Sequence, residues 1–229
     1  MIVVTGRMFR SVRPYVQKAG IDDPVICYQG AVVADPASGR FLRHIPIPLD
    51  LAREAIGAVE AAGFGLNCYV DDELYVAEET DWARAYVEYQ NLELQVVGDL
   101  RSWLTESPTK LVAVGDPDEL DVLKLELAAQ FDGRMFISKS LPYFLEFASP
   151  EVSKGSGLGF LAERLGFTAA QTVAAGDGEN DRELLDWAGY AVCVEDADPS
   201  LFPRADLVVP SAEEEGVADL IESYLDSRE

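Results

Sequence analysis

The stretch that decides the fold is Ala174-Ala175-Gly176-Asp177-Gly178-Glu179-Asn180-Asp181. Its apolar start predicts a short buried strand that brings Asp177 to the C-terminal end, where open α/β sheets bind ligands. Gly176 and Gly178 permit a sharp turn of the backbone, and Asp181 begins the next predicted helix. Two close carboxylates suit a hard cation such as Mg²⁺, which prefers oxygen ligands. A plain turn with an aspartate N-cap explains the same pattern and stays open.

Two other short segments could take part in the same chemistry. Lys154 precedes a predicted helix, where an ammonium group could offset charge between a phosphate and crowded carboxylates. An exposed lysine is the ordinary alternative, although a cation is unfavourable at a helix N-terminus. Thr5-Gly6-Arg7 ends a short apolar run, and a hydroxyl with free N–H groups at a strand end can hold phosphate oxygens. A simple strand-to-helix turn is the alternative there.

The two ends of the chain share one pattern, in which apolar strands alternate with helices. At the N-terminal end, Ile2-Val3-Val4 and residues 24–28 are predicted strands on either side of a helix at 11–19, which is typical of a parallel βαβ unit. The C-terminal third repeats the alternation, and its continuous apolar strands indicate a parallel sheet that is covered on both faces. Its predicted strands are 172–175, 190–194 and 207–209, and its predicted helices are 157–165, 181–188 and 216–225.

The middle of the chain has a different pattern, in which strands come in pairs between helices. This arrangement predicts an antiparallel α+β lobe inserted into the parallel domain. We therefore expect a Rossmann-like core at 1–49 and 140–229 and an inserted cap at 50–139. The predicted helices are 49–63, 81–89 and 117–131, and the predicted strands are 65–70, 74–77, 92–97, 110–114, 134–138 and 143–147.

Taken together, these segments resemble the haloacid dehalogenase (HAD) superfamily, in the Cof-type, subclass IIB sugar-phosphatase branch. That family has a strand-end Thr or Ser, then a Lys, then an acidic Gly-Asp-x-x-Asn-Asp loop, in the order seen in this chain. Further likeness lies in residues 24–31, in Val152-Ser153-Lys154-Gly155 and in residues 216–218. The chain departs from the branch at Gln29, where Asn is usual, and at Asp196, where Asn is frequent.

The resemblance implies an enzyme that hydrolyses a small phosphorylated metabolite, such as a sugar phosphate, with Mg²⁺ as cofactor. It implies a catalytic set, a metal-binding pair and a set that binds phosphate oxygens. The catalytic set is Thr5, Lys154 and Asp177, and the metal-binding pair is Asp177 and Asp181. The residues that bind phosphate oxygens are Thr5, Gly6, Arg7, Lys154 and Asn180. The cap would close over the site and select the leaving group.

The family's first motif, Asp-x-Asp-Gly-Thr, provides the nucleophile, and it does not occur in these 229 residues. Asp116-Pro117-Asp118 and Asp196-Ala197-Asp198 are only partial matches. We therefore expect the natural protein to be longer at its N-terminus, with the central nucleophile strand missing from this sequence. The alternatives are a non-catalytic phosphosugar-binding or regulatory protein, and a phosphomutase that transfers the group to a second substrate.

Composition excludes several other classes. The 18 basic and 41 acidic residues give a formal charge of −23, which repels nucleic acids and anionic membranes. The three cysteines are widely separated and lack zinc spacing. With a single histidine, His44, acid–base chemistry falls to carboxylates. No signal peptide or membrane-length apolar run occurs, so we expect a cytoplasmic protein. The sequence does not determine its oligomeric state.

Overall fold

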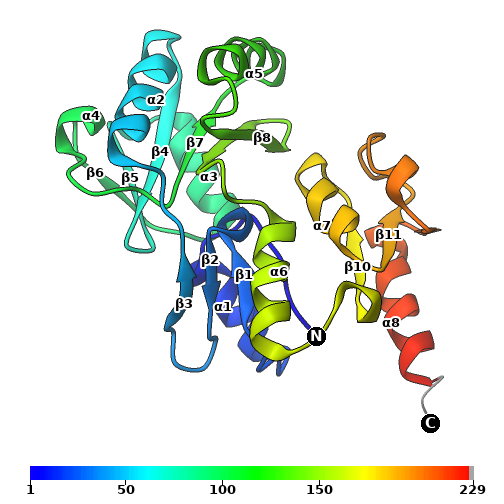
Figure 1. Ribbon diagram of the computed structural model, residues 1–229. Coiled ribbons are helices and arrows are strands. Elements are labelled where there is room, and N and C mark those ends of the chain that lie inside the picture. Colours follow the sequence, from blue (N-terminus) through cyan, green and yellow to red (C-terminus); the bar gives the residue numbers. More distant parts are fainter. Residues whose placement is uncertain (227–229) are drawn as a thin grey trace. The chain divides into compact units, whose positions relative to one another are not determined.

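The computed structural model describes residues 1–226 and has a mixed α/β architecture (Figure 1). The chain divides into two compact units, with the boundary between Val152 and Ser153. The division of the chain into core and cap stays a prediction. None of the helices within residues 1–226 combines the length and apolarity needed to cross a membrane.

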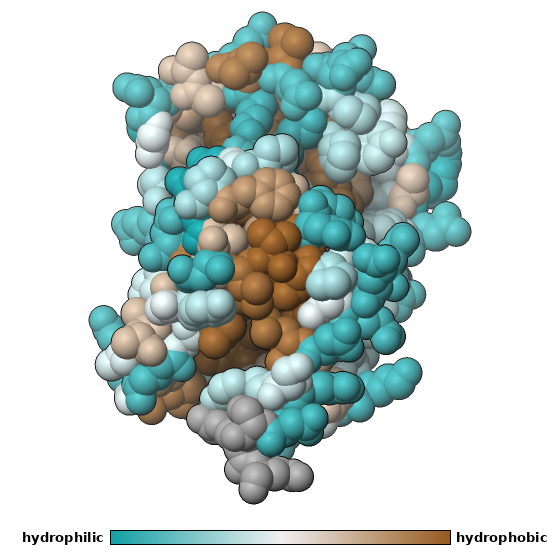
Figure 2. Space-filling model, turned by 90° about the vertical axis from the view of Figure 1, so that its right-hand side faces the viewer, coloured by the Kyte–Doolittle hydropathy of each residue, from teal (hydrophilic) through white to brown (hydrophobic). Residues whose placement is uncertain are grey.

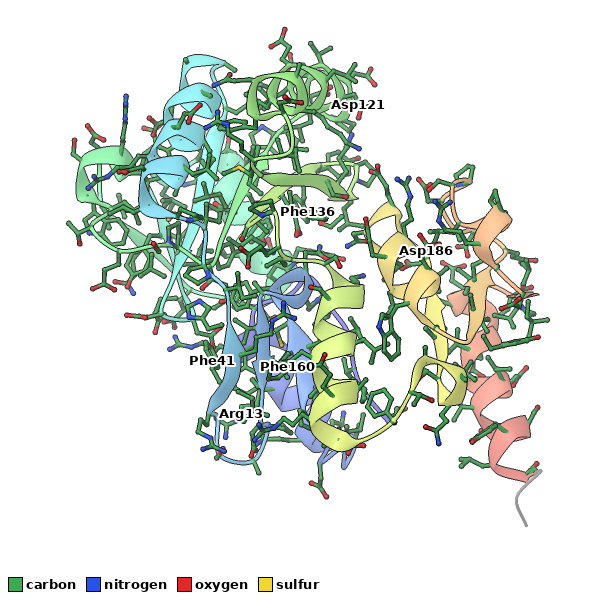
Figure 3. All side chains as sticks on the ribbon, viewed as in Figure 1. Arg13, Phe41, Asp121, Phe136, Phe160 and Asp186 are labelled. Carbon is green, nitrogen blue, oxygen red and sulfur yellow. The ribbon has the colours of Figure 1, made fainter. Side chains whose placement is uncertain are left out.

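The first unit begins with a helix and a small sheet. These are α1 (Phe9–Lys18), β1 (Val25–Cys27), β2 (Val32–Ala34) and β3 (Phe41–His44). The predicted first strand is reduced to a single bridge, in which Val4 pairs in parallel with Ile26. The parallel geometry agrees with the predicted βαβ unit, but β1, β2 and β3 continue as an antiparallel sheet that the sequence pattern did not predict. Phe41 of β3, labelled in Figure 3, packs edge-on against Phe9 of α1.

The larger part of the first unit is a six-stranded sheet in the order β6-β5-β4-β7-β9-β8. All its neighbouring strands are antiparallel except β5 and β6, as expected of the α+β lobe. The predicted bounds of β4, β7 and α5 are the observed ones. The elements are α2 (Leu49–Ala61), β4 (Gly65–Val70), β5 (Glu73–Val76), α3 (Asp81–Gln90), β6 (Leu94–Val96), α4 (Leu100–Trp103), β7 (Lys110–Val114), α5 (Pro117–Phe131), β8 (Phe136–Leu141) and β9 (Phe144–Ala148).

Both faces of this sheet are buried, in two separate apolar clusters. Side chains of a strand point alternately to its two faces, and β7 shows this directly. Leu111 and Ala113 join the cluster that α2 and α5 cover. Val112 and Val114 join the cluster formed with α1, β1 and β2. The second cluster therefore ties the N-terminal segment to the six-stranded sheet within one compact unit.

The second unit is a three-stranded parallel sheet with helices. It contains α6 (Lys154–Leu165), β10 (Val173–Gly176), α7 (Arg182–Trp187), β11 (Tyr190–Val194), β12 (Leu207–Val209) and α8 (Gly216–Asp226). The strand order β10-β11-β12 is parallel throughout, as predicted. Single 3-10 turns precede or link elements of both units: Tyr28–Gly30, Ala169–Gln171, Glu179–Asp181, Phe202–Arg204 and Ala212–Glu214.

The prediction that both faces of the parallel sheet are covered is confirmed for the middle strand β11, where residues 191–194 are buried, but it is wrong for parts of the outer strands β10 and β12. Val173 and Val208 are 54% and 47% exposed, and the strand register places them on opposite faces. Helix α8 likewise exposes Ile221, Tyr224 and Leu225, one helical turn apart. Figure 2 shows apolar side chains gathered on the surface where this part of the chain faces the viewer. A continuous apolar strand predicts burial, but it does not specify which element provides the cover.

Candidate functional site

The acidic loop follows β10 directly, at the carboxyl edge of the parallel sheet. The backbone turns sharply at Gly176 and Gly178, where any larger side chain would collide with its neighbours. A Cβ atom on Gly176 would come within 2.6 Å of the Asp181 Cβ, and one on Gly178 within 2.6 Å of the Asn180 Oδ1. Asp181 and Asn180 are both buried. The two glycines therefore allow these side chains to lie against the loop beside Asp177.

Asp181 holds the loop together with both of its carboxylate oxygens. Its Oδ2 accepts hydrogen bonds from the N–H groups of Asp177 and Gly178, each at 3.1 Å. Its Oδ1 accepts from the Nζ of Lys154 at 2.5 Å. The Lys154 and Asp181 side chains are only 8% and 4% exposed, so this is a buried ion pair. The structure thus brings together Lys154, Asp177 and Asp181, as the sequence predicted, while their catalytic roles stay predictions.

Lys154 is fixed by the start of helix α6, of which it is the first residue. Ser153 is the N-cap, and it forms a reciprocal capping box with Ser156. Such a cap satisfies N–H groups that the first turn of a helix leaves free. The next residue, Gly155, lies against α7, because a Cβ atom there would come within 2.2 Å of the Glu183 carbonyl oxygen. The close approach of α6 and α7 therefore sets the direction in which Lys154 points.

Replacing Gly155 with alanine is expected to destabilise the protein by about 1–3 kcal/mol, the usual cost of overpacking a close contact. The clash is with backbone, which cannot rotate away as a side chain can. The measurement is urea unfolding of this variant beside Gly65→Ala, whose added Cβ meets nothing within 4 Å. Equal unfolding midpoints for the two variants would contradict the close packing of α6 on α7.

Asp177 is the more accessible of the two carboxylates, because its side chain is exposed while Asp181 is buried. Partial desolvation by the loop raises the pKa of Asp177, and the nearby Asp181 charge raises it further, while Lys154 lowers it. Two crowded carboxylates that resist ionising together are suited to a bound cation, which removes the repulsion.

The residues of this loop fit Mg²⁺. This ion keeps several waters and binds through one or two carboxylates, and the loop provides two beside a turn that only glycines allow. Among residues 1–226, no group of three or more His, Cys, Asp or Glu side chains is arranged to hold a metal. A site that encloses its metal with protein ligands alone, such as structural zinc, therefore has no counterpart in the described chain.

The Thr5-Gly6-Arg7 segment lies in the first unit and is held by backbone hydrogen bonds. The N–H of Thr5 donates to the Ile26 carbonyl at 2.9 Å, and its carbonyl accepts from the Gln29 N–H at 3.2 Å. The N–H of Arg7 donates to the Thr5 Oγ1 at 3.1 Å. The Arg7 guanidinium stacks over the Tyr89 ring, 5.6 Å from its centre. Since this segment and the acidic loop belong to different units, their assembly into one phosphate site stays a prediction.

The two partial matches to the missing nucleophile motif have local structural roles. Asp116 is the N-cap of α5 and accepts hydrogen bonds from the N–H groups of Asp118 and Glu119. Asp198 accepts from both the N–H and the hydroxyl of Ser200. Helix capping and turn formation are the ordinary uses of aspartate in such places, so neither segment needs a catalytic explanation.

The sequence reasoning did not find the charged residues that contact the Thr5-Gly6-Arg7 segment. Lys110 donates through its Nζ to the Gly6 carbonyl at 2.8 Å and pairs with Glu146 at 3.3 Å. Both are almost fully buried. A signal did exist, because Lys-Leu-Val-Ala-Val and Phe-Leu-Glu-Phe-Ala each place one charge in a predicted strand that is otherwise apolar.

Known proteins match the chain over nearly its whole length. The family model described as haloacid dehalogenase-like hydrolase matches residues 1–221. A 5-amino-6-(5-phospho-D-ribitylamino)uracil phosphatase of Bacillus subtilis is 25% identical, over 97% of this chain and 83% of the relative. A phosphoglycolate phosphatase of Archaeoglobus fulgidus is 28% identical, over 97% of this chain and 81% of the relative.

The fold also matches solved structures. The HAD subclass IIB sugar phosphatase BT4131 aligns with a TM-score of 0.82 at 16% identity, over 97% of this chain and 84% of that chain. At that identity the likeness concerns the fold, and it agrees with the resemblance inferred from the motifs.

Proposed function

The chain belongs to the haloacid dehalogenase-like hydrolases, and from this membership we propose that the complete protein is a Mg²⁺-dependent phosphatase of small phosphorylated metabolites. Its relatives include enzymes named as phosphatases of a phosphorylated uracil derivative and of phosphoglycolate. A sugar phosphate or a compound of similar size is the proposed substrate class. The proposed reaction proceeds through an aspartyl-phosphate, which water then cleaves.

The observation that carries the proposal is the buried contact of Lys154 with Asp181 beside the exposed Asp177. When bound, Mg²⁺ would neutralise charge on the phosphoryl group. Asp177 would hold the ion with Asp181, which also keeps the loop N–H groups and the Lys154 ammonium in place. The rigid α6 start fixes Lys154 in that position, and a fixed cation needs no reorganisation as a phosphate oxygen arrives.

The other proposed phosphate ligands are the Thr5 hydroxyl, the Gly6 N–H and the Arg7 side chain. A hydroxyl at a strand end can donate to a phosphate oxygen, and adjacent N–H groups form anion-binding concavities. Asn180, buried against Gly178, would orient Lys154 or the metal's ligands. None of the residues named here is proposed as the nucleophile, because the family's Asp-x-Asp-Gly-Thr motif does not occur in these 229 residues.

The test is a phosphatase assay of the protein purified from its native source, whose intact mass is measured first. The panel consists of p-nitrophenyl phosphate, several sugar phosphates and phosphoglycolate, with Mg²⁺ added or removed by EDTA. We expect release of inorganic phosphate from at least one sugar phosphate, its loss with EDTA and its recovery with Mg²⁺. Release of phosphate that is unaffected by EDTA would contradict the metal assignment. A native mass of 25.0 kDa together with no release would contradict the enzymatic proposal and favour a binding protein.

A further inference from the structure

A buried ion pair connects strands of the six-stranded sheet. Lys110 is the first residue of β7 and Glu146 lies in β9, the neighbouring strand. Their side chains are 2% and 6% exposed, and Lys110 Nζ lies 3.3 Å from Glu146 Oε1. Removing two charges from water costs several kcal/mol for each ion, and apolar residues of similar volume often give equal or higher stability. Stability alone therefore does not explain this pair.

Two neutral side chains also donate hydrogen bonds to the Glu146 carboxylate. Its Oε1 accepts from the Ser140 hydroxyl at 2.6 Å, and its Oε2 accepts from the Gln29 side-chain N–H at 2.7 Å. Gln29 is itself 1% exposed. These bonds hold the carboxylate in one orientation, with one oxygen directed at the Lys110 ammonium.

Lys110 directs its charge at the backbone of the Thr5-Gly6-Arg7 segment. Its Nζ donates to the Gly6 carbonyl at 2.8 Å, which is shorter than its contact with Glu146 and joins residues 104 apart in sequence. Lys110 also lies over the Tyr69 ring, 5.1 Å from its centre. Gly6 leaves room for Gln29 in this arrangement, because a Cβ on Gly6 would come within 2.4 Å of the Gln29 Nε2 and force that side chain to move.

The orientation of one peptide group links Lys110 to the Thr5 hydroxyl. In a trans peptide the C=O and the next N–H point in opposite directions, so fixing the Gly6 carbonyl also fixes the Arg7 N–H. That N–H donates to Thr5 Oγ1 at 3.1 Å. The Thr5 hydroxyl has a single proton. Because the Arg7 N–H donates to the hydroxyl oxygen and cannot accept from it, the proton is available for another acceptor. The ammonium also polarises the peptide, and hydrogen bonds in a chain strengthen one another.

We propose that Lys110, charge-balanced by Glu146, is a positioning residue that holds the Thr5 hydroxyl ready to donate to a phosphate oxygen. This inference rests on the proposed function, because it deepens the role of Thr5 in phosphate binding. Lys110 does not touch the phosphate in this proposal, and it acts only through the Gly6–Arg7 peptide.

The test uses three variants of the full chain: Thr5→Val, the double variant Lys110→Met/Glu146→Gln, and the triple variant that combines them. The double variant removes both charges, so that no unpaired charge stays buried. The readout is the Kd for inorganic phosphate in the presence of Mg²⁺. We expect Thr5→Val and the double variant each to weaken binding by about tenfold, the effect of one hydrogen bond to a charged group. The triple variant should bind no more weakly than Thr5→Val, since both changes act on one hydroxyl.

Two outcomes of the binding assay would overturn the inference. One is an unchanged Kd in the double variant while Thr5→Val weakens binding. The other is a triple variant whose loss equals the product of the separate losses, because independent effects add in free energy. Leu127→Ala is the control for general destabilisation. Leu127 is buried in the cluster that α2 and α5 cover, away from the Thr5-Gly6-Arg7 segment, and its Kd should match the wild type.

A second measurement separates failure of this inference from failure of the proposed function. The backbone amide of Arg7 is followed by ¹H–¹⁵N NMR, and we expect an upfield proton shift and faster hydrogen exchange in the double variant but not in Leu127→Ala. If the wild type does not bind phosphate, the proposed phosphate role fails, and the inference is overturned with it. In that case the Arg7 amide still shows whether Lys110 orients the peptide. An Arg7 amide that is identical in the wild type and the double variant overturns the positioning role whatever the phosphate affinity.

Discussion

Replacing Lys154 with methionine is expected to destabilise the protein by about 3–5 kcal/mol, the usual cost of breaking a buried ion pair from one side. The loss follows from the burial of Asp181, whose Oδ1 now accepts from the Lys154 ammonium at 2.5 Å. Methionine fills much of the same volume, so the charge is the main change. The measurement is the free energy of unfolding from urea titration.

Two further variants locate the cause of that loss. Lys154→Met/Asp181→Asn removes both charges and should recover most of the lost stability, because the amide oxygen can still accept from the loop N–H groups. Lys139→Met is the matched control. Lys139 pairs with Asp121, a residue on α5 that is 61% exposed (Figure 3), and a partly exposed pair contributes no more than about 1 kcal/mol. Equal losses in Lys154→Met and Lys139→Met would contradict the burial of the Lys154–Asp181 pair.

Replacing Asp177 with asparagine is expected to abolish Mg²⁺-dependent phosphatase activity. Mg²⁺ binding should weaken by at least about 10- to 100-fold, because mutating residues that only support a metal ligand already has an effect of that size. The binding of Mg²⁺ is followed through protein stability. At a Mg²⁺ concentration 100 times its Kd, the wild type should gain about 2.7 kcal/mol, and the variant much less. Asp196→Asn, an exposed aspartate on the loop after β11, is the control and should respond as the wild type does. An Asp177→Asn protein that keeps full activity would contradict the site.

Without Mg²⁺, the Asp177→Asn variant should be more stable than the wild type at neutral pH. The pKa of Asp177 is raised from its ordinary value of 3.8 by partial desolvation and by the Asp181 charge. A carboxyl whose pKa is raised by folding favours the protonated form in the folded state, so its charge destabilises the fold above that pKa. This destabilisation decreases as the pH falls through the raised pKa of Asp177, and it is absent below the ordinary pKa of aspartate. The stability difference between Asp177→Asn and wild type should therefore shrink as the pH falls from 7 toward 4.

Several elements could be predicted from the sequence because their signals are local. Helix α5 starts after an Asp N-cap with proline in its first turn and ends at an aspartate followed by glycine, and its predicted bounds are the observed ones. Strand β11 is a short apolar run between Gly189 and Glu195, and its predicted bounds are the observed ones. In contrast, Ile2-Val3-Val4 has the composition of a strand but forms only one bridge. Composition indicates what a segment favours, while pairing depends on which partner lies beside it.

The clustering of carboxylates in the acidic loop could be predicted from the sequence, because Asp177, Asp181 and the two glycines lie within six residues. The ion pair of Lys154 with Asp181 also required the packing of α6 against α7, because the two residues are 27 apart in sequence. The contact of Lys110 with Gly6, which are 104 residues apart, could not be predicted from the sequence and arises from tertiary packing. The physical reason is that strand periodicity specifies which face a side chain occupies, but not which segment covers that face. That choice depends on the packing of the whole unit, and it placed a buried cation behind the Thr5 hydroxyl.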